Sequence, residues 1–172
     1  MPRTRSRTGS AKAPHDAAAA GRVAVIGAGY WGVNLIRVFA ELGALAAVCD
    51  SKEERLTPLA DAHPSITRTT RPLDVFSDPS IGGVVIATPA ATHYRLAREA
   101  LLAGKDVFVE KPLALKVVEG EELVRLAHAQ QRLLMVGHLL EYHPAVVKLK
   151  ALVDSGALGK IEYLYSHRLN LG

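Results

Sequence analysis

Three glycines stand at the spacing of a phosphate-binding turn. Gly27, Gly29 and Gly32 form a G-x-G-x-x-G pattern directly after the apolar run RVAVI. In such a turn the first glycine allows a tight bend, the second lets the backbone approach a pyrophosphate, and the third lets a helix pack closely on the strand. Free N–H groups at the start of that helix would bind the phosphates. Alone the pattern is weak evidence, because glycine triplets also arise by chance.

An acidic side chain stands where the same kind of site needs one. Asp50 ends the next apolar run, ALAAVCD. A carboxylate about 20 residues beyond the glycines accepts both hydroxyls of the adenosine ribose in a bound dinucleotide. Because it would repel a 2′-phosphate, Asp50 favours NAD over NADP. The alternative is that Asp50 only caps a helix beginning near Lys52. Taken together, the turn and the acid predict an NAD site.

A second polar pair follows another apolar run. Glu110, Lys111 and Pro112 come directly after DVFV. Pro112 restricts Lys111 to an extended backbone and so fixes its direction. A lysine at this point can hold or polarise a hydroxyl or carbonyl oxygen of a substrate. The alternative is an ordinary solvated exit from a strand.

The elements that must position these residues alternate along the chain. Short apolar runs predict strands, and segments with apolar residues at helical spacing predict helices between them. The predicted strands are 22–27, 44–50, 82–88, 106–110 and 132–138, and the predicted helices are 33–43, 92–104 and 116–130. This alternation predicts an α/β fold, a Rossmann doubly wound parallel sheet with helices on both faces. The carboxyl ends of its strands share one edge, where ligands bind.

Charge and cysteine content narrow the class of protein. Residues 1–20 carry +3 of the net charge of +4, so the rest of the chain is nearly neutral and does not indicate a nucleic-acid partner. We expect residues 1–20 to be a disordered basic tail without a secretory h-region. The single cysteine, Cys49, permits no internal disulfide and is interpreted as a core residue. We therefore expect a cytoplasmic protein without a membrane span.

Other chemistries lack their motifs. The sequence contains no Gly-x-Ser-x-Gly elbow and no His-Glu-x-x-His pair, and one cysteine cannot form a thiolate zinc cluster. We therefore predict no metal site. Trp31, inside the glycine turn, has two open interpretations: it covers the cofactor or it packs on the sheet.

The last segment differs in its pattern. Residues 21–138 form the predicted NAD-binding domain, and residues 139–172 are interpreted as a linker helix and the first strand of an incomplete second domain. The helix would run from Pro144 to Gly156. A period-2 alternation over 160–169 then predicts a strand of an open-faced antiparallel sheet, the start of a truncated α+β domain.

Several motifs occur in the order found in one family. GAGYWG, Asp50, ATPAATH, AGKDVFVEKPLAL and LLMVGH resemble the glucose–fructose oxidoreductase and inositol dehydrogenase family (Gfo/Idh/MocA), from about residue 22 to the end. This resemblance implies an NAD-dependent oxidoreductase in which Lys111 is the catalytic lysine beside the nicotinamide and the substrate. It implies cofactor-binding roles for Gly27, Gly29, Tyr30, Trp31, Gly32, Asp50, Thr88, Pro89, His93 and Glu110. Helix capping and a helix-surface position are the alternatives for Thr88 and His93.

The C-terminal motifs HLLEYHPA and RLNLG resemble the nucleotide-sugar branch of that family, the UDP-N-acetylglucosamine and UDP-N-acetylglucosaminuronate 3-dehydrogenases. The branch passes a hydride from sugar C3 to NAD. His138, Tyr142 and His143 would then face the substrate, and structural roles for them remain open. The family's catalytic histidine lies beyond the last residue given, so a non-catalytic NAD-binding module and another sugar or cyclitol dehydrogenase are the alternatives. We expect the full-length protein to be a homo-oligomer.

Overall fold

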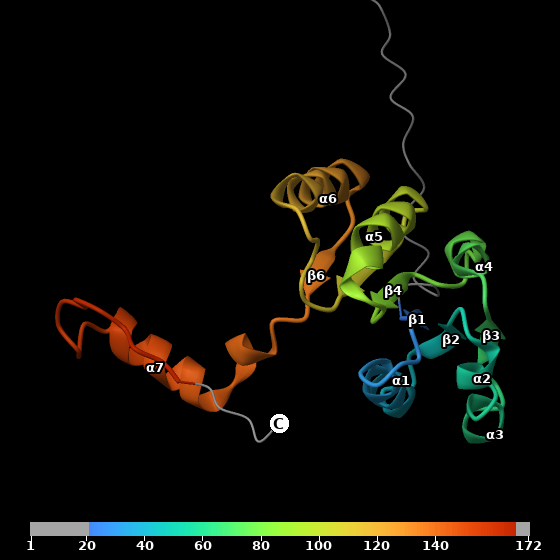
Figure 1. Ribbon diagram of the computed structural model, residues 1–172, viewed down its shortest axis with the longest axis horizontal. Coiled ribbons are helices and arrows are strands. Elements are labelled where there is room, and N and C mark those ends of the chain that lie inside the picture. The colour runs from blue at the N-terminus through green and yellow to red at the C-terminus, as the bar shows by residue number, and fades with distance from the viewer. Residues whose placement is uncertain (1–20, 168–172) are drawn as a thin grey trace, which may run out of the picture. The chain divides into compact units, whose positions relative to one another are not determined.

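The computed structural model describes residues 21–167 and contains two compact units (Figure 1). One unit ends at Val136 and the other begins at Gly137. The predicted tail, residues 1–20, lies outside the described residues, as do residues 168–172. Each unit is described by itself.

The first unit is built on a six-stranded parallel sheet with the strand order β3-β2-β1-β4-β5-β6. From β1 the chain moves outward to β2 and β3, and it then returns to the other side of β1 to add β4, β5 and β6. A crevice opens at such a reversal, outside the carboxyl ends of the strands. The predicted Rossmann fold is therefore confirmed. The strands are β1 Val23–Ile26, β2 Leu45–Cys49, β3 Thr67–Thr69, β4 Gly83–Ile86, β5 Asp106–Val109 and β6 Leu134–Val136.

Helices cover both faces of this sheet (Figure 1). They are α1 Gly32–Glu41, α2 Glu53–Leu56, α3 Leu59–Ala62, α4 Pro72–Ser77, α5 His93–Leu102 and α6 Val117–Gln130, with a 3-10 turn, η1, at Ala90–Thr92. Successive residues of β1 point to opposite faces: Ala24 and Ile26 pack with α4, α5 and α6, whereas Val25 packs on the side of α1 and α2. Burial on both faces explains why the strand sequences are continuously apolar.

The strand β3 was not predicted from the sequence. Thr67, Arg68 and Thr69 of β3 are polar and partly or fully exposed, and they show no apolar pattern. They form a strand because their backbone pairs with Ala47, Val48 and Cys49 of β2. Such an edge strand is defined by backbone hydrogen bonds, which a side-chain pattern does not reveal.

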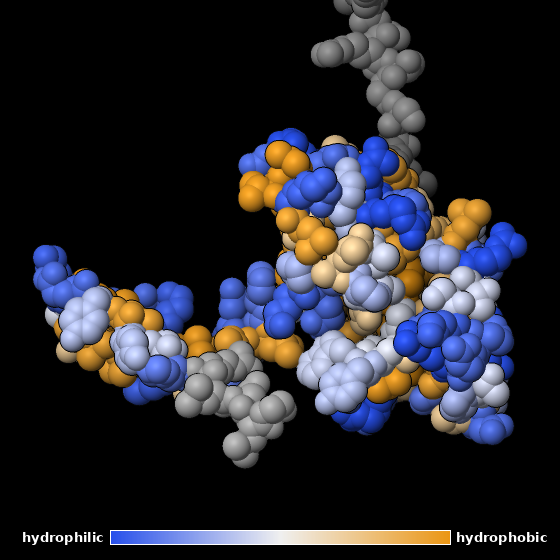
Figure 2. Space-filling view, in the orientation of Figure 1, coloured by the Kyte–Doolittle hydropathy of each residue, from blue (hydrophilic) through white to orange (hydrophobic). Residues whose placement is uncertain are grey.

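The second unit contains the 3-10 turn η2, Leu139–Tyr142, and the helix α7, Pro144–Asp154. Apolar side chains lie on its surface (Figure 2), and no residue of 138–167 is buried. The strand predicted over 160–169 is absent from residues 161–167, and residues 168 and 169 lie outside the described part. A strand needs a partner for its backbone groups, and no described segment of this unit provides one. The strand prediction is therefore wrong for residues 161–167 of this chain, whereas the antiparallel sheet of a longer protein stays a prediction. In the part of the chain that the structure describes, we find no helix with the length and apolar character needed to span a bilayer.

Candidate functional site

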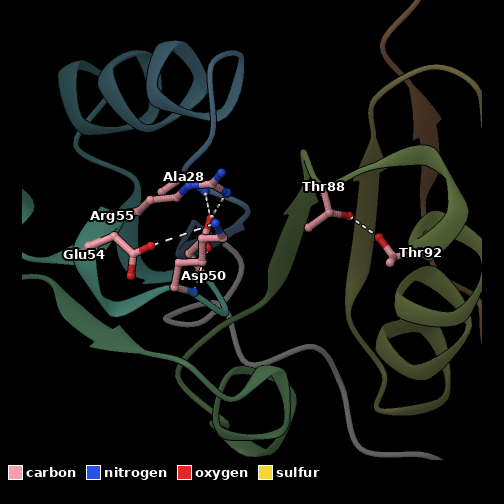
Figure 3. A network of polar contacts seen from close by, with 7 residues as sticks. Ala28, Asp50, Glu54, Arg55, Thr88 and Thr92 are labelled. Atoms are coloured by element: carbon pink, nitrogen blue, oxygen red, sulfur yellow. Dashed lines mark hydrogen bonds and ion pairs between the residues drawn. The ribbon is translucent and has the colours of Figure 1, made fainter.

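A cavity of about 570 Å³ lies at the carboxyl edge of β1, β2 and β4. Its walls come from the glycine turn after β1, from Asp50 and Ser51 after β2, and from residues 87–89 after β4. Figure 3 shows Ala28, Asp50 and Arg55 gathered on one side of this opening and Thr88 with Thr92 on the other. Further walls come from Tyr30, Arg55, Thr70, Pro72, Thr92, Arg95 and Leu96.

Each glycine of the turn has its own structural reason. Gly27 has φ +104°, and a Cβ there would lie 2.7 Å from the carbonyl oxygen of Ala87. A Cβ on Gly32 would lie 1.9 Å from the carbonyl oxygen of Gly27, so helix α1 can begin here only with glycine. A Cβ on Gly29 would meet nothing closer than Arg55 Nη1 at 3.8 Å. The space beside Gly29 is therefore open, as a cradle for a phosphate requires.

Asp50 is 4% exposed and is held on several sides. Its Oδ2 accepts hydrogen bonds from the Ala28 N–H at 2.8 Å and from Arg55 Nη1 at 3.3 Å, and its Oδ1 accepts one from the Lys52 N–H at 2.9 Å (Figure 3). The capping alternative is wrong, because α2 begins after Lys52 without a side-chain cap, and Asp50 instead fastens the glycine turn. A carboxylate has about four acceptor positions, so one remains for a ribose hydroxyl. Accepting both hydroxyls would require Arg55 to move.

Arg55 lines the cavity, and the sequence analysis did not predict it as a site residue. Its side chain is 44% exposed, and its guanidinium lies against Asp50 and beside Gly29. The arginine follows Asp50 by five residues and belongs to the short helix α2. A basic residue in a charged surface stretch gives no signal by itself. Only the turn of the chain after β2 brings it back to the cavity.

The donor and acceptor roles of the Thr88 hydroxyl group follow from its neighbours. Thr92 Oγ1 donates to the carbonyl oxygen of Pro89 at 2.7 Å, and Thr88 Oγ1 lies 2.7 Å from Thr92 Oγ1. Because the Thr92 hydroxyl has a single hydrogen, Thr88 must be the donor to Thr92. Thr88 therefore offers only acceptor lone pairs to the cavity, which suits a hydroxyl or amide N–H of a bound molecule.

We expected His93 to line the cofactor cavity, but it is not one of the lining residues. It is 1% exposed, with Nδ1 2.7 Å from the carbonyl oxygen of Pro112 and Nε2 2.8 Å from that of Thr88. Its backbone N–H caps the C-terminal end of η1, but the buried side chain does not lie on a helix surface, so that alternative is wrong. Its ring instead joins the loop after β4 to the loop after β5.

The loop after β5 lies at the same edge of the sheet, outside the cavity lining. Trp31 Nε1 donates a 2.7 Å hydrogen bond to Glu110 Oε1, so the indole of the glycine turn holds the acid of this loop. Neither interpretation of Trp31 had anticipated this contact. Lys111 is exposed, and its peptide bond to Pro112 is cis. The cavity lining therefore does not include four of the predicted site residues, Trp31, Gly32, Glu110 and Lys111.

Cys49 lies at the end of β2, under the cavity, and is 1% exposed. Burial, followed by the charges of Asp50 and Asp74, raises the pKa of its thiol to about 12. The thiol is therefore protonated at neutral pH and is a core residue rather than a nucleophile.

The remaining predicted residues belong to the second unit. His143 Nδ1 accepts a 3.2 Å hydrogen bond from the Ala145 N–H and so caps α7, which is a structural role. Tyr142 is 68% exposed, and His138 precedes η2. No cluster of three potential metal ligands occurs within residues 21–167.

The strand order, the glycine turn and the acid after β2 define a dinucleotide-binding Rossmann domain. The chain belongs to the Gfo/Idh/MocA family, whose model, described as an oxidoreductase family with an NAD-binding Rossmann fold, matches residues 21–138. NAD is the cofactor of this domain, and the open space at Gly29 together with the remaining acceptor position of Asp50 fits its pyrophosphate and ribose.

Curated relatives include oxidoreductases with different names. The chain is 36% identical over 148 residues to the uncharacterised oxidoreductase YdgJ of Escherichia coli, covering 85% of this chain and 42% of the relative. It is 33% identical to inositol 2-dehydrogenase of Rhodococcus jostii (81% and 39% covered). It is 31% identical to UDP-N-acetylglucosamine 3-dehydrogenase of Acidithiobacillus ferrooxidans (86% and 45% covered). The chain thus spans less than half the length of each of these relatives.

Solved structures show the same fold. An oxidoreductase from Agrobacterium radiobacter in complex with NAD+, L-tartaric acid and magnesium matches with a TM-score of 0.74 at 26% identity, covering 82% of this chain and 42% of that one. The WlbA dehydrogenase from Bordetella pertussis, in complex with NADH and UDP-GlcNAcA, matches with a TM-score of 0.76 at 24% identity, covering 81% and 43%. The second likeness concerns the fold alone.

Proposed function

We propose that this chain is the cofactor-binding part of an NAD-dependent dehydrogenase that oxidises a hydroxyl of a sugar, with C3 of a UDP-N-acetyl sugar as the reacting carbon. The observation that carries the proposal is the arrangement at one sheet edge. Asp50 and the open glycine turn border the cavity, and Lys111 follows β5, next to β4. The motifs HLLEYHPA and RLNLG and the UDP-N-acetylglucosamine 3-dehydrogenase relative support the choice of sugar.

In this proposal the chain's own residues bind and orient. When bound, NAD supplies a nicotinamide ring that accepts a hydride. The N–H groups at the start of α1 and the acceptor of Asp50 hold the phosphate and ribose parts. Thr88 accepts a hydrogen bond from the cofactor, and Lys111 holds the oxygen of the reacting hydroxyl while it becomes a carbonyl. Substrate contacts by His138, Tyr142 and His143 of the second unit stay predictions, and Nδ1 of His143 already caps α7.

A cyclitol is the alternative substrate. The inositol 2-dehydrogenase relative is 33% identical, as similar as the UDP-sugar enzyme, so the identities do not separate the two. Both substrates offer a ring hydroxyl, and the same lysine would serve either. The proposal further includes a cytoplasmic setting, a homo-oligomeric whole protein and no nucleic-acid partner.

The test has two stages. Calorimetry should first show NAD binding to the 172-residue chain, tighter than NADP binding. NADH formation is then measured with UDP-N-acetylglucosamine, its uronic acid and myo-inositol, in this chain and in a longer protein that contains it. We expect turnover of a UDP-sugar by the longer protein only. A positioned general base typically contributes about 10²–10⁴-fold to a rate, and we propose that the longer protein supplies this base. Oxidation of myo-inositol alone would replace the UDP-sugar with a cyclitol, and rapid turnover by this chain would contradict the proposed division of roles.

A further inference from the structure

The loop that carries Lys111 is fastened on both sides of the lysine. On one side, the Glu110 carboxylate accepts the indole N–H of Trp31 at 2.7 Å. On the other side, the carbonyl oxygen of Pro112 lies 2.7 Å from Nδ1 of the buried His93. Lys111 stands between these two points with an exposed side chain. The loop position is therefore set by contacts of its neighbours.

The two contacts connect the lysine loop to different parts of the first unit. His93 belongs to α5 and is buried, so it ties the loop to the core. Trp31 belongs to the glycine turn, between Tyr30, which lines the cavity, and Gly32, where α1 begins. Trp31 is 42% exposed. A displacement of the glycine turn would therefore reach Glu110 directly through the indole.

We propose that Trp31 is a positioning residue for Lys111: its indole N–H holds Glu110 and so couples the phosphate-binding turn to the lysine loop. An indole is only a donor and an ionised carboxylate only an acceptor, so the hydrogen bond can run only from Trp31 to Glu110. Without it, the Glu110 carboxylate is free to rotate, and the nearest cation along the chain is Lys111 itself. The coupling rests on the proposed function for the role of Lys111, but the contact and its response can be measured without turnover.

The probe is ADP, which has the adenosine and pyrophosphate of the cofactor and lacks the nicotinamide. Glu110 and Lys111 do not line the cavity, so we expect ADP at Asp50 and the glycine turn to leave them untouched, and a response there to be transmitted. Backbone amide signals of Glu110 and Lys111 are followed by NMR during an ADP titration of the whole chain. Trp31 is the only tryptophan in the sequence, so its fluorescence reports the state of the turn in the same titration.

In the unaltered chain we expect ADP to change both the fluorescence of Trp31 and the amide signals of Glu110 and Lys111. Trp31→Phe keeps a ring and removes the donor, and Glu110→Ala removes the acceptor, so each should abolish the response of the Lys111 amide. Glu110→Gln keeps an acceptor oxygen and should preserve the response. Combining Trp31→Phe with Glu110→Ala should add nothing to either single change, because both remove one interaction.

A matched control lies elsewhere in the same unit. Tyr94 donates a 2.7 Å hydrogen bond to Glu122 between α5 and α6, so Tyr94→Phe removes a contact of the same kind, outside the lysine loop. It should leave the Lys111 response intact. A Lys111 response that persists in both Trp31→Phe and Glu110→Ala, with ADP bound, overturns the coupling alone. Failure of ADP to bind the unaltered chain overturns the cofactor site and the coupling with it.

Discussion

Two strands of the sheet, β2 and β5, are each followed by an acidic residue at the same edge, and the surroundings of the two acids differ. Asp50 is 4% exposed and accepts hydrogen bonds from two backbone N–H groups and from Arg55. Glu110 is only partly buried and is held by the indole of Trp31, next to the exposed Lys111. The carboxylate after β2 is thus held mainly by backbone N–H groups, whereas the carboxylate after β5 is held by a side chain.

We expect this difference to reflect two roles, with cofactor binding at the end of β2 and the chemical step at the end of β5. Backbone N–H groups cannot rotate away from Asp50, so the acceptor that we propose for the ribose is preorganised. Lys111 has solvent on its exposed side, and a substrate would have to be held there by further protein surface. We therefore expect changes near β2 to alter NAD affinity and changes near β5 to alter turnover.

The largest expected effect comes from Gly32→Ala. Its Cβ would lie 1.9 Å from a backbone oxygen, which cannot move as a flexible side chain can. Overpacking of this kind costs about 3 kcal/mol or more, so chemical denaturation should show a strongly destabilised or unfolded chain. A stable, NAD-binding Gly32→Ala protein would contradict the geometry of the turn.

Gly29→Ala is the matched control. The new methyl group would meet nothing closer than 3.8 Å in the protein, so the melting temperature should remain near that of the unaltered chain. The methyl group would occupy the space of the pyrophosphate, so calorimetry should show weakened NAD binding. Equal NAD affinity in this variant would mean that the phosphates bind elsewhere.

The next effect in size is that of Asp50→Ala. Removing a charged acceptor costs about 1.5–3 kcal/mol of binding, so NAD affinity should fall about ten- to hundredfold. The preference for NAD over NADP should relax, because Arg55 then stands without its carboxylate partner near the ribose. Calorimetric titration with both cofactors measures this. Tighter binding of NADP by the unaltered chain would contradict the role of Asp50.

The sequence predicted the end of β2 better than the end of β5. Asp50 could be placed because an apolar strand and an acid at its end are local features of one segment. The Trp31–Glu110 contact joins residues 79 positions apart, and it depends on the strand order that places β5 beside β4. Arg55 and β3 were missed because their positions depend on the return of the chain after β2 and on backbone pairing. The strand predicted over 160–169 does not form in residues 161–167. Alternation of apolar and polar residues indicates a strand but does not provide the neighbouring strand that its backbone must pair with.

A smaller effect, on stability rather than binding, is expected for His93→Ala. The change removes the ring between two carbonyl oxygens, those of Thr88 and Pro112, and leaves a buried space. A buried group left without its hydrogen bond costs about 1–3 kcal/mol, so the denaturation midpoint should fall. NAD affinity should change less than in Asp50→Ala, because His93 does not line the cavity. A loss of NAD affinity larger than that of Asp50→Ala, in a folded protein, would place His93 at the cofactor after all.

The smallest effect on the chain itself is expected for Lys111→Ala, and this is the sharpest test of the comparison. The side chain is exposed and lies outside the cavity lining, so both the denaturation midpoint and NAD affinity should stay close to those of the unaltered chain. In a longer protein that turns over a sugar, the same change should slow hydride transfer while NAD affinity is retained, since the proposed role of the lysine is to hold the reacting oxygen. A large fall in NAD affinity would show that the end of β5 also binds the cofactor. Binding and chemistry would then not be divided between β2 and β5.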